Sequence, residues 1–156
     1  MNRKVTFTED YRRLIEHRIV GDKNRLQQVF MNLLTNAIKF SPEDGKINVT
    51  ASSLPAHTNN QDSVPVVMIS VIVQDDGPGI APDDQDRIWL PFTTLERNRH
   101  LNPHGVGLGL TLCKIICENF GGDIAVYSDG QNGSTFEFRF MVKYSYQGQD
   151  KEENPI

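Results

Sequence analysis

The sequence lacks the features that mark several specialised classes of protein. It has only two cysteines, Cys113 and Cys117, and two thiolates alone do not close the four-ligand shell of a structural zinc ion. No apolar run approaches the roughly 20 residues that a membrane span requires, and residues 1–20 lack the apolar core of a signal peptide. We therefore expect a cytoplasmic domain without direct membrane contact, even where its parent protein is membrane-anchored.

Charge and composition are ordinary as well. A net charge of −4, from 16 basic and 20 acidic residues, gives no sign of a nucleic-acid partner. Hydrophobic residues make up 38% and aromatic residues 8% of the 156-residue chain, as in soluble globular proteins. This length fits one domain, which we expect over residues 1–146, with residues 147–156 as a polar tail. The two cysteines lie four residues apart in an apolar run and are interpreted as core residues.

The hydrophobic pattern predicts an α+β fold, a two-layer sandwich of a mixed β-sheet covered by helices on one face. The clearest element is a helix after Asp22, in which apolar residues recur at the spacing of one buried face, with Ser41-Pro42 at its end. Thr8-Glu9-Asp10 indicates an earlier helix start, after a strand at 4–8. The other expected elements are a turn at Asp44-Gly45, a strand at 46–54, an exposed hairpin loop at 55–64, a strand buried on both faces at 66–73, a short helix at 84–90, a long loop at 93–106, a helix at 108–120 closed by Gly121-Gly122, and strands at 123–128 and 135–142.

A stripe of polar side chains runs beside the apolar face of the long helix. Gln28, Asn32, Asn36 and Lys39 share this stripe, although asparagine is a mediocre helix former. One interpretation is a solvated helix face. The other is that an amide oxygen supplies a ligand to Mg²⁺, which takes only one or two protein ligands and keeps water and phosphate oxygens for the rest. From this helix alone, the solvated face is favoured.

Two glycine-rich segments offer further candidate binding residues. Residues 75–80, Asp-Asp-Gly-Pro-Gly-Ile, follow the strand at 66–73. Their glycines allow close approach to a flat ligand, and a carboxylate at a strand end accepts a hydrogen bond from an amine such as that of adenine. Residues 105–110 lead into a helix, where free N–H groups and the helix dipole favour phosphate, although the pattern is neither that of a Rossmann fold nor that of a P-loop. Taken alone, residues 75–80 also fit a tight Gly-Pro-Gly turn with solvated acidic side chains, and a glycine-rich run such as residues 105–110 is weak evidence by itself.

Taken together and in order, these segments resemble a known family. Residues 32–40, 75–80, 88–92 and 105–110 resemble the N, G1, F and G2 boxes of sensor histidine kinases. The residues Gly121-Gly122-Asp123-Ile124 and Gly133-Ser134-Thr135-Phe136 look like the closing pattern of the same family, so that the resemblance runs from about residue 20 to residue 140. It implies the Bergerat nucleotide-binding fold, shared with the gyrase, Hsp90 and MutL ATPases.

The resemblance also implies ATP and Mg²⁺ as cofactors. Asn36 would ligate Mg²⁺, Asp75 would accept a hydrogen bond from the adenine amino group, and Thr135 would reach adenine through water. Residues 93–106 would form a lid over ATP, with Phe92 as its anchor. The implied ATP-binding residues are Asn32, Asn36, Lys39, Asp75, Gly77, Gly79, Ile80, Phe92, Gly105, Val106, Gly107, Leu108, Gly109, Leu110 and Thr135.

One position separates two branches of this superfamily. Its hydrolases carry a glutamate four residues before the magnesium asparagine, where this chain has Asn32. An amide does not act as a general base toward water, whereas phosphoryl transfer to a protein group depends mainly on positioning and charge neutralisation. The resemblance therefore favours a protein histidine kinase domain over an ATPase. A nucleotide-sensing module that has lost transfer is a further alternative.

The lid and the acceptor depart from the full family pattern. His104-Gly105-Val106 stands where many members have Gly-Gly-Thr, and Thr93-Thr94 follows Phe92 without the arginine that some members use, so that Arg97 or Arg99 would have to substitute. None of the four histidines stands in the phosphoacceptor motif. The acceptor histidine is therefore expected on a dimerisation domain outside this chain, which would in turn serve a response regulator in two-component signalling, and the isolated domain is expected to be a monomer.

Overall fold

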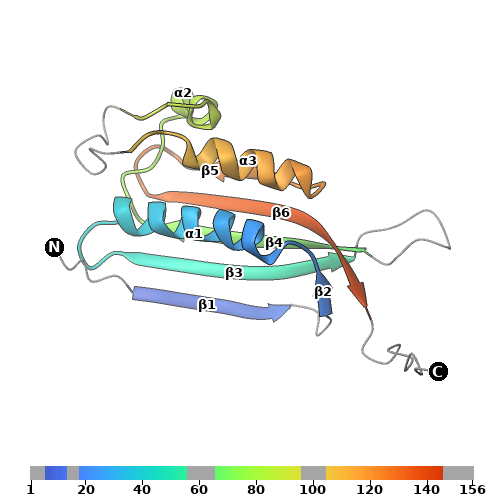
Figure 1. The fold of residues 1–156 in the computed structure, drawn as a ribbon. Coiled ribbons are helices and arrows are strands. Elements are labelled where there is room, and N and C mark those ends of the chain that lie inside the picture. The colour runs from blue at the N-terminus through green and yellow to red at the C-terminus, as the bar shows by residue number, and fades with distance from the viewer. Residues whose placement is uncertain (1–5, 14–17, 56–65, 96–104, 146–156) are drawn as a thin grey trace, which may run out of the picture.

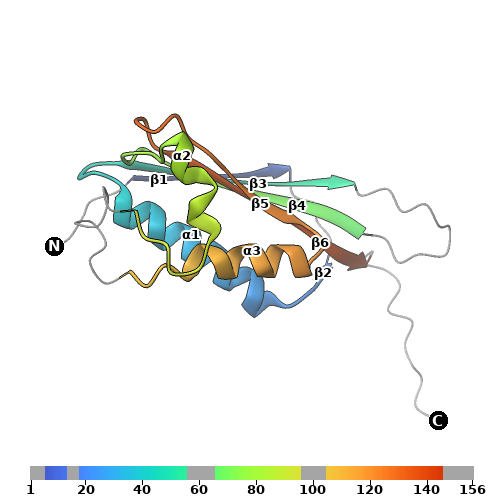
Figure 2. The same ribbon diagram turned by 90° about the horizontal axis from the view of Figure 1, so that it is seen from above.

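The computed structural model describes residues 6–13, 18–55, 66–95 and 105–145, and these form one six-stranded sheet with helices against one of its faces (Figures 1 and 2). This is the predicted α+β two-layer arrangement. The elements in chain order are β1 (Thr6–Arg13), β2 (Arg18–Val20), α1 (Lys23–Phe40), β3 (Lys46–Pro55), β4 (Val66–Asp75), α2 (Pro82–Gln85), the 3-10 helix η1 (Arg87–Trp89), α3 (Gly109–Asn119), β5 (Asp123–Tyr127) and β6 (Ser134–Ser145).

The long strands β4 and β6 are the framework of the sheet. The strand order is β1-β3-β4-β6, and the other edge of β6 pairs with β5 near its start and with β2 near its end. β1 runs parallel to β3, whereas the other pairs are antiparallel. Asp75 at the end of β4 pairs with Ser134 at the start of β6. The segment that follows β4 is therefore brought next to the turn that precedes β6.

Helix α1 has the boundaries that its local sequence signals predict. The carboxylate of Asp22 caps it by accepting hydrogen bonds from the N–H groups of Asn24 and Arg25, at 3.0 and 3.1 Å. The helix ends at Ser41, whose ψ of 145° is extended, as expected for a residue before proline. Asp44, with φ 61°, then turns the chain into β3. These two ends fix where the polar stripe of α1 lies along the sheet.

The core lies between the sheet and the helices α1 and α3. Val29 and Leu33 of α1 and Phe138 of β6 are at most 2% exposed. Cys113 and Cys117 of α3 are each 1% exposed, which confirms that they are packing residues. The strand at 66–73, by contrast, was expected to be buried on both faces, and that expectation is wrong. Val67, Ile69 and Val73 face the helices and are buried, but Met68 and Ile72 on the other face are only half-buried, because no element covers them within the described residues.

One prediction of local structure is wrong, and the bounds of another are shifted. The helix expected from Thr8 onward is strand β1 as far as Arg13, because this segment pairs in parallel with β3 over Lys46–Ser52. A capping signal is local, and the pairing with a distant strand outweighs it. The short helix expected at 84–90 begins at Pro82 and is divided into α2 and η1, because proline is well suited to the first turn of a helix.

The remaining strands and α3 follow the prediction closely, and β2 was not predicted. Gly121, with φ 66°, closes α3, as expected for a glycine after a helix. The loop of the β3–β4 hairpin, most of the expected lid, all four histidines and the C-terminal tail lie outside the described residues. No helix within the described ranges is both long enough and apolar enough to cross a membrane.

Candidate functional site

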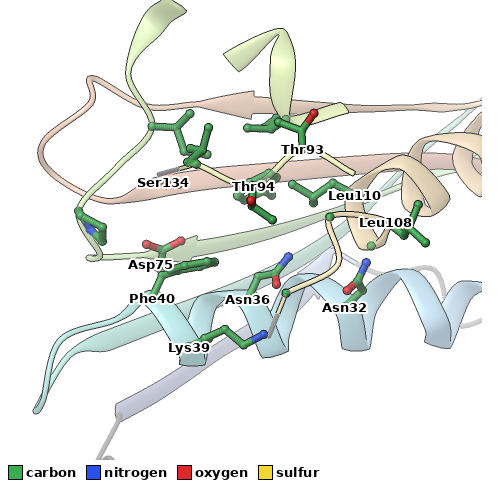
Figure 3. A pocket seen from close by; sticks show the side chains of 18 of the residues that line it. Asn32, Asn36, Lys39, Phe40, Asp75, Thr93, Thr94, Leu108, Leu110 and Ser134 are labelled. Carbon is green, nitrogen blue, oxygen red and sulfur yellow. The ribbon is translucent and has the colours of Figure 1, made fainter. Parts of the chain in front are cut away.

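A cavity of about 290 Å³ opens between α1, the segment after β4 and the start of α3. Figure 3 shows Asn32, Asn36 and Lys39 along α1 on one side of it, Asp75 and Phe40 at one end, and Thr93 and Thr94 across from α1. All of the residues that the sequence singled out as nucleotide contacts line this cavity except Gly77, Phe92 and Thr135. Three segments far apart in the sequence therefore meet at one cavity.

The polar stripe of α1 is divided between solvent and cavity. Gln28 is exposed and accepts a hydrogen bond from Arg25, whereas Asn32, Asn36 and Lys39 are half-buried and line the cavity. Because three of the four positions face a pocket, the solvated-face interpretation of this helix holds only for its first turns.

Asn32 is held where α1 and α3 approach closely. Its Nδ2 donates a hydrogen bond to Sγ of Cys113 at 3.1 Å. A Cβ added at Gly109 would lie 2.7 Å from both Nδ2 and Oδ1 of Asn32, so the close approach depends on the glycine at this position. Hydrogen bonding to the sulfur directs the nitrogen of the amide toward α3.

Asp75 is a buried carboxyl group at the end of β4. Asp75 is only 8% exposed, and its Oδ1 accepts a hydrogen bond from the N–H of Gly77 at 2.9 Å. Burial raises the pKa of Asp75 to about 6, although hydrogen bonds from the N–H groups of Gly77 and Ser134 lower it, and the nearby charge of Asp76 raises it further. A group with this pKa still ionises at neutral pH and then accepts hydrogen bonds inside the cavity.

Asp76, its neighbour in sequence, has a different task. It is exposed, and its Oδ2 accepts a hydrogen bond from the N–H of Lys46 at 2.9 Å. It thus fastens the end of β4 to the start of β3, outside the cavity. Gly77 lies behind Asp75, where a Cβ would meet the Asp75 carboxylate at 2.8 Å and the carbonyl oxygen of Phe40 at 2.9 Å. Gly77 therefore shapes the wall without lining the cavity.

The segment before α3 is the second glycine-dependent wall. Gly107 has φ 74°, and a Cβ there would lie 2.6 Å from the carbonyl oxygen of Thr93. The N–H of Phe92 donates to the carbonyl oxygen of Gly107 at 2.9 Å, so the two ends of the 93–106 segment are tied together. Phe92 itself has φ 61° and is 72% exposed, with its side chain outside the cavity.

Helix α3 begins at this wall without a side-chain cap. Its first-turn N–H groups, from Gly109 onward, are therefore available to an anionic ligand, which the positive end of the helix dipole also favours. On the opposite side of the cavity lies the carboxylate of Asp75. The cavity thus offers an acceptor at one end and donors at the other.

Thr135 lies on the other face of β6 from the cavity. Its neighbours Ser134 and Phe136 line the cavity instead, because side chains alternate between the two faces of a strand. The sequence pattern therefore places the strand correctly, and the contact of Thr135 with adenine through water stays a prediction. Ser134 also donates its N–H toward Asp75.

Sequence reasoning missed several further lining residues, most of them apolar. The sequence did contain a signal for them. Phe40 ends the long helix and follows Lys39, while Ile88 and Phe136 belong to the apolar core. Trp89 packs edge-on against Phe136, with ring centroids 6.2 Å apart, and so supports this wall. The missed lining residues are Phe40, Pro78, Ile88, Thr93, Thr94, Leu95, Ser134 and Phe136.

The cavity fits Mg²⁺ only together with a ligand that brings oxygen atoms of its own. Across the described residues, no group of three or more His, Cys, Asp or Glu side chains is placed to hold a metal ion. The amides of Asn32 and Asn36 do line the cavity, and amide oxygen is a suitable ligand for Mg²⁺ in sites completed by water and phosphate. A planar amine-bearing ring near Asp75 and a metal-bound polyphosphate near α3 are the ligands that this donor set suits.

Comparison with known proteins identifies a family that combines these features. The family described as histidine kinase-, DNA gyrase B-, and HSP90-like ATPase matches residues 21–144. The chain is 35% identical over 135 residues to the adaptive-response sensory kinase SasA of Synechococcus sp. (strain CC9311), which covers 86% of this chain and 32% of the relative. It is 38% identical over 124 residues to SasA of Thermosynechococcus vestitus, covering 80% of this chain and 30% of that relative. The chain thus spans about a third of the length of the curated relatives it matches.

Solved structures agree with the sequence comparison. The nucleotide-free catalytic domain of histidine kinase ThkA is similar at a TM-score of 0.64 and 31% identity, covering 89% of this chain and 80% of that one. Full-length ShkA in complex with AMPPNP is similar at a TM-score of 0.65 and 28% identity, covering 90% of this chain and 26% of that one.

Proposed function

The chain belongs to the family of histidine kinase-, DNA gyrase B- and HSP90-like ATPases, and we propose that it is the catalytic domain of a sensor histidine kinase. In this proposal it binds ATP with Mg²⁺ and transfers the γ-phosphoryl group to a histidine on a dimerisation domain outside this chain. The observation that carries the proposal is the cavity, in which Asp75, Asn36 and the glycine-rich start of α3 come together.

Each end of the cavity has a part in the proposed binding. The Asp75 carboxylate accepts a hydrogen bond from the adenine amino group, while apolar side chains such as Phe40 and Ile80 enclose the ring. The phosphates lie toward α3, whose free N–H groups donate to them. Asn36 supplies an oxygen ligand to Mg²⁺, which neutralises phosphate charge when bound.

Asn32 supports transfer to a protein over hydrolysis. Within the described part of the cavity lining, Asp75 is the only carboxylate, and it lies at the far end from α3. The amide of Asn32 occupies the α3 end and has no basic site with which to take a proton from water. In the transfer, a nitrogen of the acceptor imidazole bonds to the γ-phosphorus, the bond to the bridging oxygen breaks, and ADP leaves with that oxygen.

The partners follow from the same proposal. An acceptor domain is required, because none of the four histidines of this chain stands in the phosphoacceptor motif. The relatives that the chain matches are about three times longer, which leaves room for such a domain in a parent protein. The phosphohistidine then serves a response regulator.

The proposal is tested with ATP labelled on the γ-phosphate. The chain is incubated with labelled ATP and Mg²⁺, with and without the dimerisation domain of its parent protein, and protein-bound label and free phosphate are both followed. We expect label on the dimerisation domain, lost when its acceptor histidine is replaced by alanine, and little free phosphate. Binding of ATP without transfer to that domain would favour a nucleotide-sensing module instead.

A further inference from the structure

The turn between β5 and β6 supports one wall of the cavity from behind. This turn, residues 128–133, lines no part of the cavity, but it packs against Gly79 and Ile80, which do. Gly79 has φ 70°, and a Cβ there would lie 2.8 Å from the backbone nitrogen of Gln131 and 2.9 Å from Oγ of Ser128. The cavity wall and the turn are thus in direct backbone contact.

One hydroxyl group joins the two segments. Oγ of Ser128 accepts hydrogen bonds from the N–H of Ile80 at 2.9 Å and from the N–H of Gly130 at 3.3 Å, and it donates to the carbonyl oxygen of Gly133 at 2.6 Å. A serine hydroxyl has one donor and two acceptor sites. All three are used here, and one of them holds the backbone of a residue that lines the cavity.

A second side chain, which comes from α2, also forms hydrogen bonds with this wall. Nε2 of Gln85 donates to the carbonyl oxygen of Ile80 at 3.1 Å and to the carbonyl oxygen of Ser128 at 2.8 Å. At the other end of the wall, the N–H of Gly133 donates to the carbonyl oxygen of Gly77 at 2.8 Å. The segment from Gly77 to Ile80 is therefore fixed to the turn at both of its ends.

The turn has a defined conformation of its own. The carboxylate of Asp129 accepts hydrogen bonds from the backbone N–H groups of Gln131 and Asn132, both at 2.8 Å, and from the side-chain amide of Asn132 at 2.6 Å. This is the arrangement by which aspartate stabilises a turn. A turn with a fixed conformation is able to hold the contacting cavity wall in one position, whereas a turn without one is not.

We propose that Ser128, supported by Gln85, is a positioning residue for the base of the bound nucleotide. It acts through Gly79 and Ile80, and it keeps the wall that follows Asp75 in place around the ring. The inference rests on the proposed nucleotide function, and it adds two residues that lie outside the cavity to the determinants of base affinity and base selectivity.

The substitution Ser128→Ala is expected to weaken binding at the base end alone. Losing the hydroxyl leaves the buried N–H of Ile80 without its acceptor, so the wall no longer holds one position. Affinity for adenosine and for ATP should fall by the same factor, roughly three- to tenfold, because the phosphate end is untouched. The preference for ATP over GTP should fall as well.

The test is displacement of a fluorescent ATP analogue from the whole chain by ATP, GTP and adenosine. Ser128→Ala is compared with the wild type and with Ser70→Ala. Ser70 is a matched control: it is 5% exposed, and its hydroxyl donates to Glu137 at 2.8 Å on the uncovered face of the sheet. A general loss of stability would affect both variants, but a loss of base selectivity should appear only in Ser128→Ala.

Gln85→Ala provides a second variant that keeps the serine. Gln85→Ala should also lower the affinity for adenosine. If Ser128→Ala does not fold, this variant tests the positioning role by itself. If the wild type binds adenine nucleotides while the variants retain its adenosine affinity and its ATP-over-GTP preference, the positioning role is contradicted and the proposed function stands. If the wild type itself binds none of the three, the proposed function fails first.

Discussion

Asp75 and Asp76 are adjacent in the sequence, yet they differ in burial and in the groups to which they bind. Asp75 is buried in the cavity with a raised pKa, whereas Asp76 is exposed and fastens β3 to β4. The family resemblance selected Asp75 correctly as a cavity residue. Composition alone does not distinguish Asp75 from Asp76. Successive side chains point to opposite sides of a strand, so only one of the two is directed into the cavity.

The first prediction at this scale concerns base selectivity. Asp75→Asn removes a charged acceptor, and a hydrogen bond to a charged group contributes about 1.5–3 kcal/mol. Affinity for ATP should therefore fall tenfold or more, to a rough approximation, while affinity for GTP changes less. The control is Asp76→Asn, an exposed neighbour outside the cavity. Equal losses for ATP and GTP would show that Asp75 does not contact the base.

The second prediction follows from the pKa of about 6 for Asp75. The ionised form accepts the amine hydrogen bond, so affinity for adenosine should be constant above pH 7 and fall as the pH decreases through about 6. At one unit below the pKa, roughly a tenth of the carboxyl remains ionised, which corresponds to about a tenfold loss. Adenosine is the probe because it has no phosphate that titrates in this range. Asp75→Asn should remove the step from the pH profile.

The raised pKa of Asp75 affects the stability of the fold in the direction opposite to its effect on adenosine affinity. Because the pKa of Asp75 is raised in the folded state above its ordinary value of 3.8, the folded chain holds this proton more tightly than the unfolded chain. The contribution of Asp75 to stability is therefore greatest below about pH 4 and is lost as the pH rises through 6.

The third prediction concerns the metal. Asn36→Ala removes an amide oxygen from the cavity, so the gain in ATP affinity that Mg²⁺ gives to the wild type should disappear. Equal affinities in Mg²⁺ and in EDTA are expected for this variant. Gln28→Ala is the control, because Gln28 belongs to the same helix stripe but is exposed outside the cavity. A wild-type dependence on Mg²⁺ that survives in Asn36→Ala would place the metal ligand elsewhere.

At the scale of elements, the parts that the sequence predicted well are those whose signals are local. Asp22 and Ser41-Pro42 set the ends of α1, and Gly121 closes α3. β1 was mistaken for a helix because its pairing partner lies over 30 residues away along the chain. Ser134 lines the cavity and Thr135 does not, and the sequence did not predict this because a motif gives the position of a strand more readily than the face toward which each side chain points.

The spacing between α1 and α3 gives a prediction of its own. Gly109→Ala places a methyl group against the amide of Asn32. That amide is the end of a flexible side chain, so it turns aside and gives up its hydrogen bond to Cys113. Gly109 is the first residue of α3, where alanine gains less over glycine than in a helix interior. We expect a chain whose stability toward urea changes little but that binds Mg-ATP several-fold more weakly.

Gly21→Ala is the control for this change. A Cβ at Gly21 meets only ordinary contacts, the nearest being 3.6 Å from Val142, and it lies outside the cavity. Unchanged Mg-ATP affinity in Gly109→Ala would mean that the α1–α3 approach at Asn32 has no bearing on the ligand.

At the scale of the whole molecule, the question is whether this cavity serves transfer or hydrolysis. With Asn32 in place of a carboxylate, the chain alone should release phosphate from ATP barely above the uncatalysed rate. Asn32→Glu installs a potential general base one helical turn from Asn36, and such a base contributes about 10²–10⁴-fold where it is correctly placed. A coupled phosphate-release assay compares the two. Brisk hydrolysis by the wild type without an acceptor domain would return the chain to the ATPase branch of its family.

The measurement that tests the central claim most directly is a titration of the whole chain with a fluorescent ATP analogue in Mg²⁺. The arrangement of Asp75, Asn36 and the start of α3 around one cavity predicts a saturable signal at micromolar to millimolar concentration, which unlabelled ATP displaces and which Asp75→Asn weakens. A signal that does not saturate, or that ATP does not displace, would contradict the assignment of this cavity as a nucleotide site.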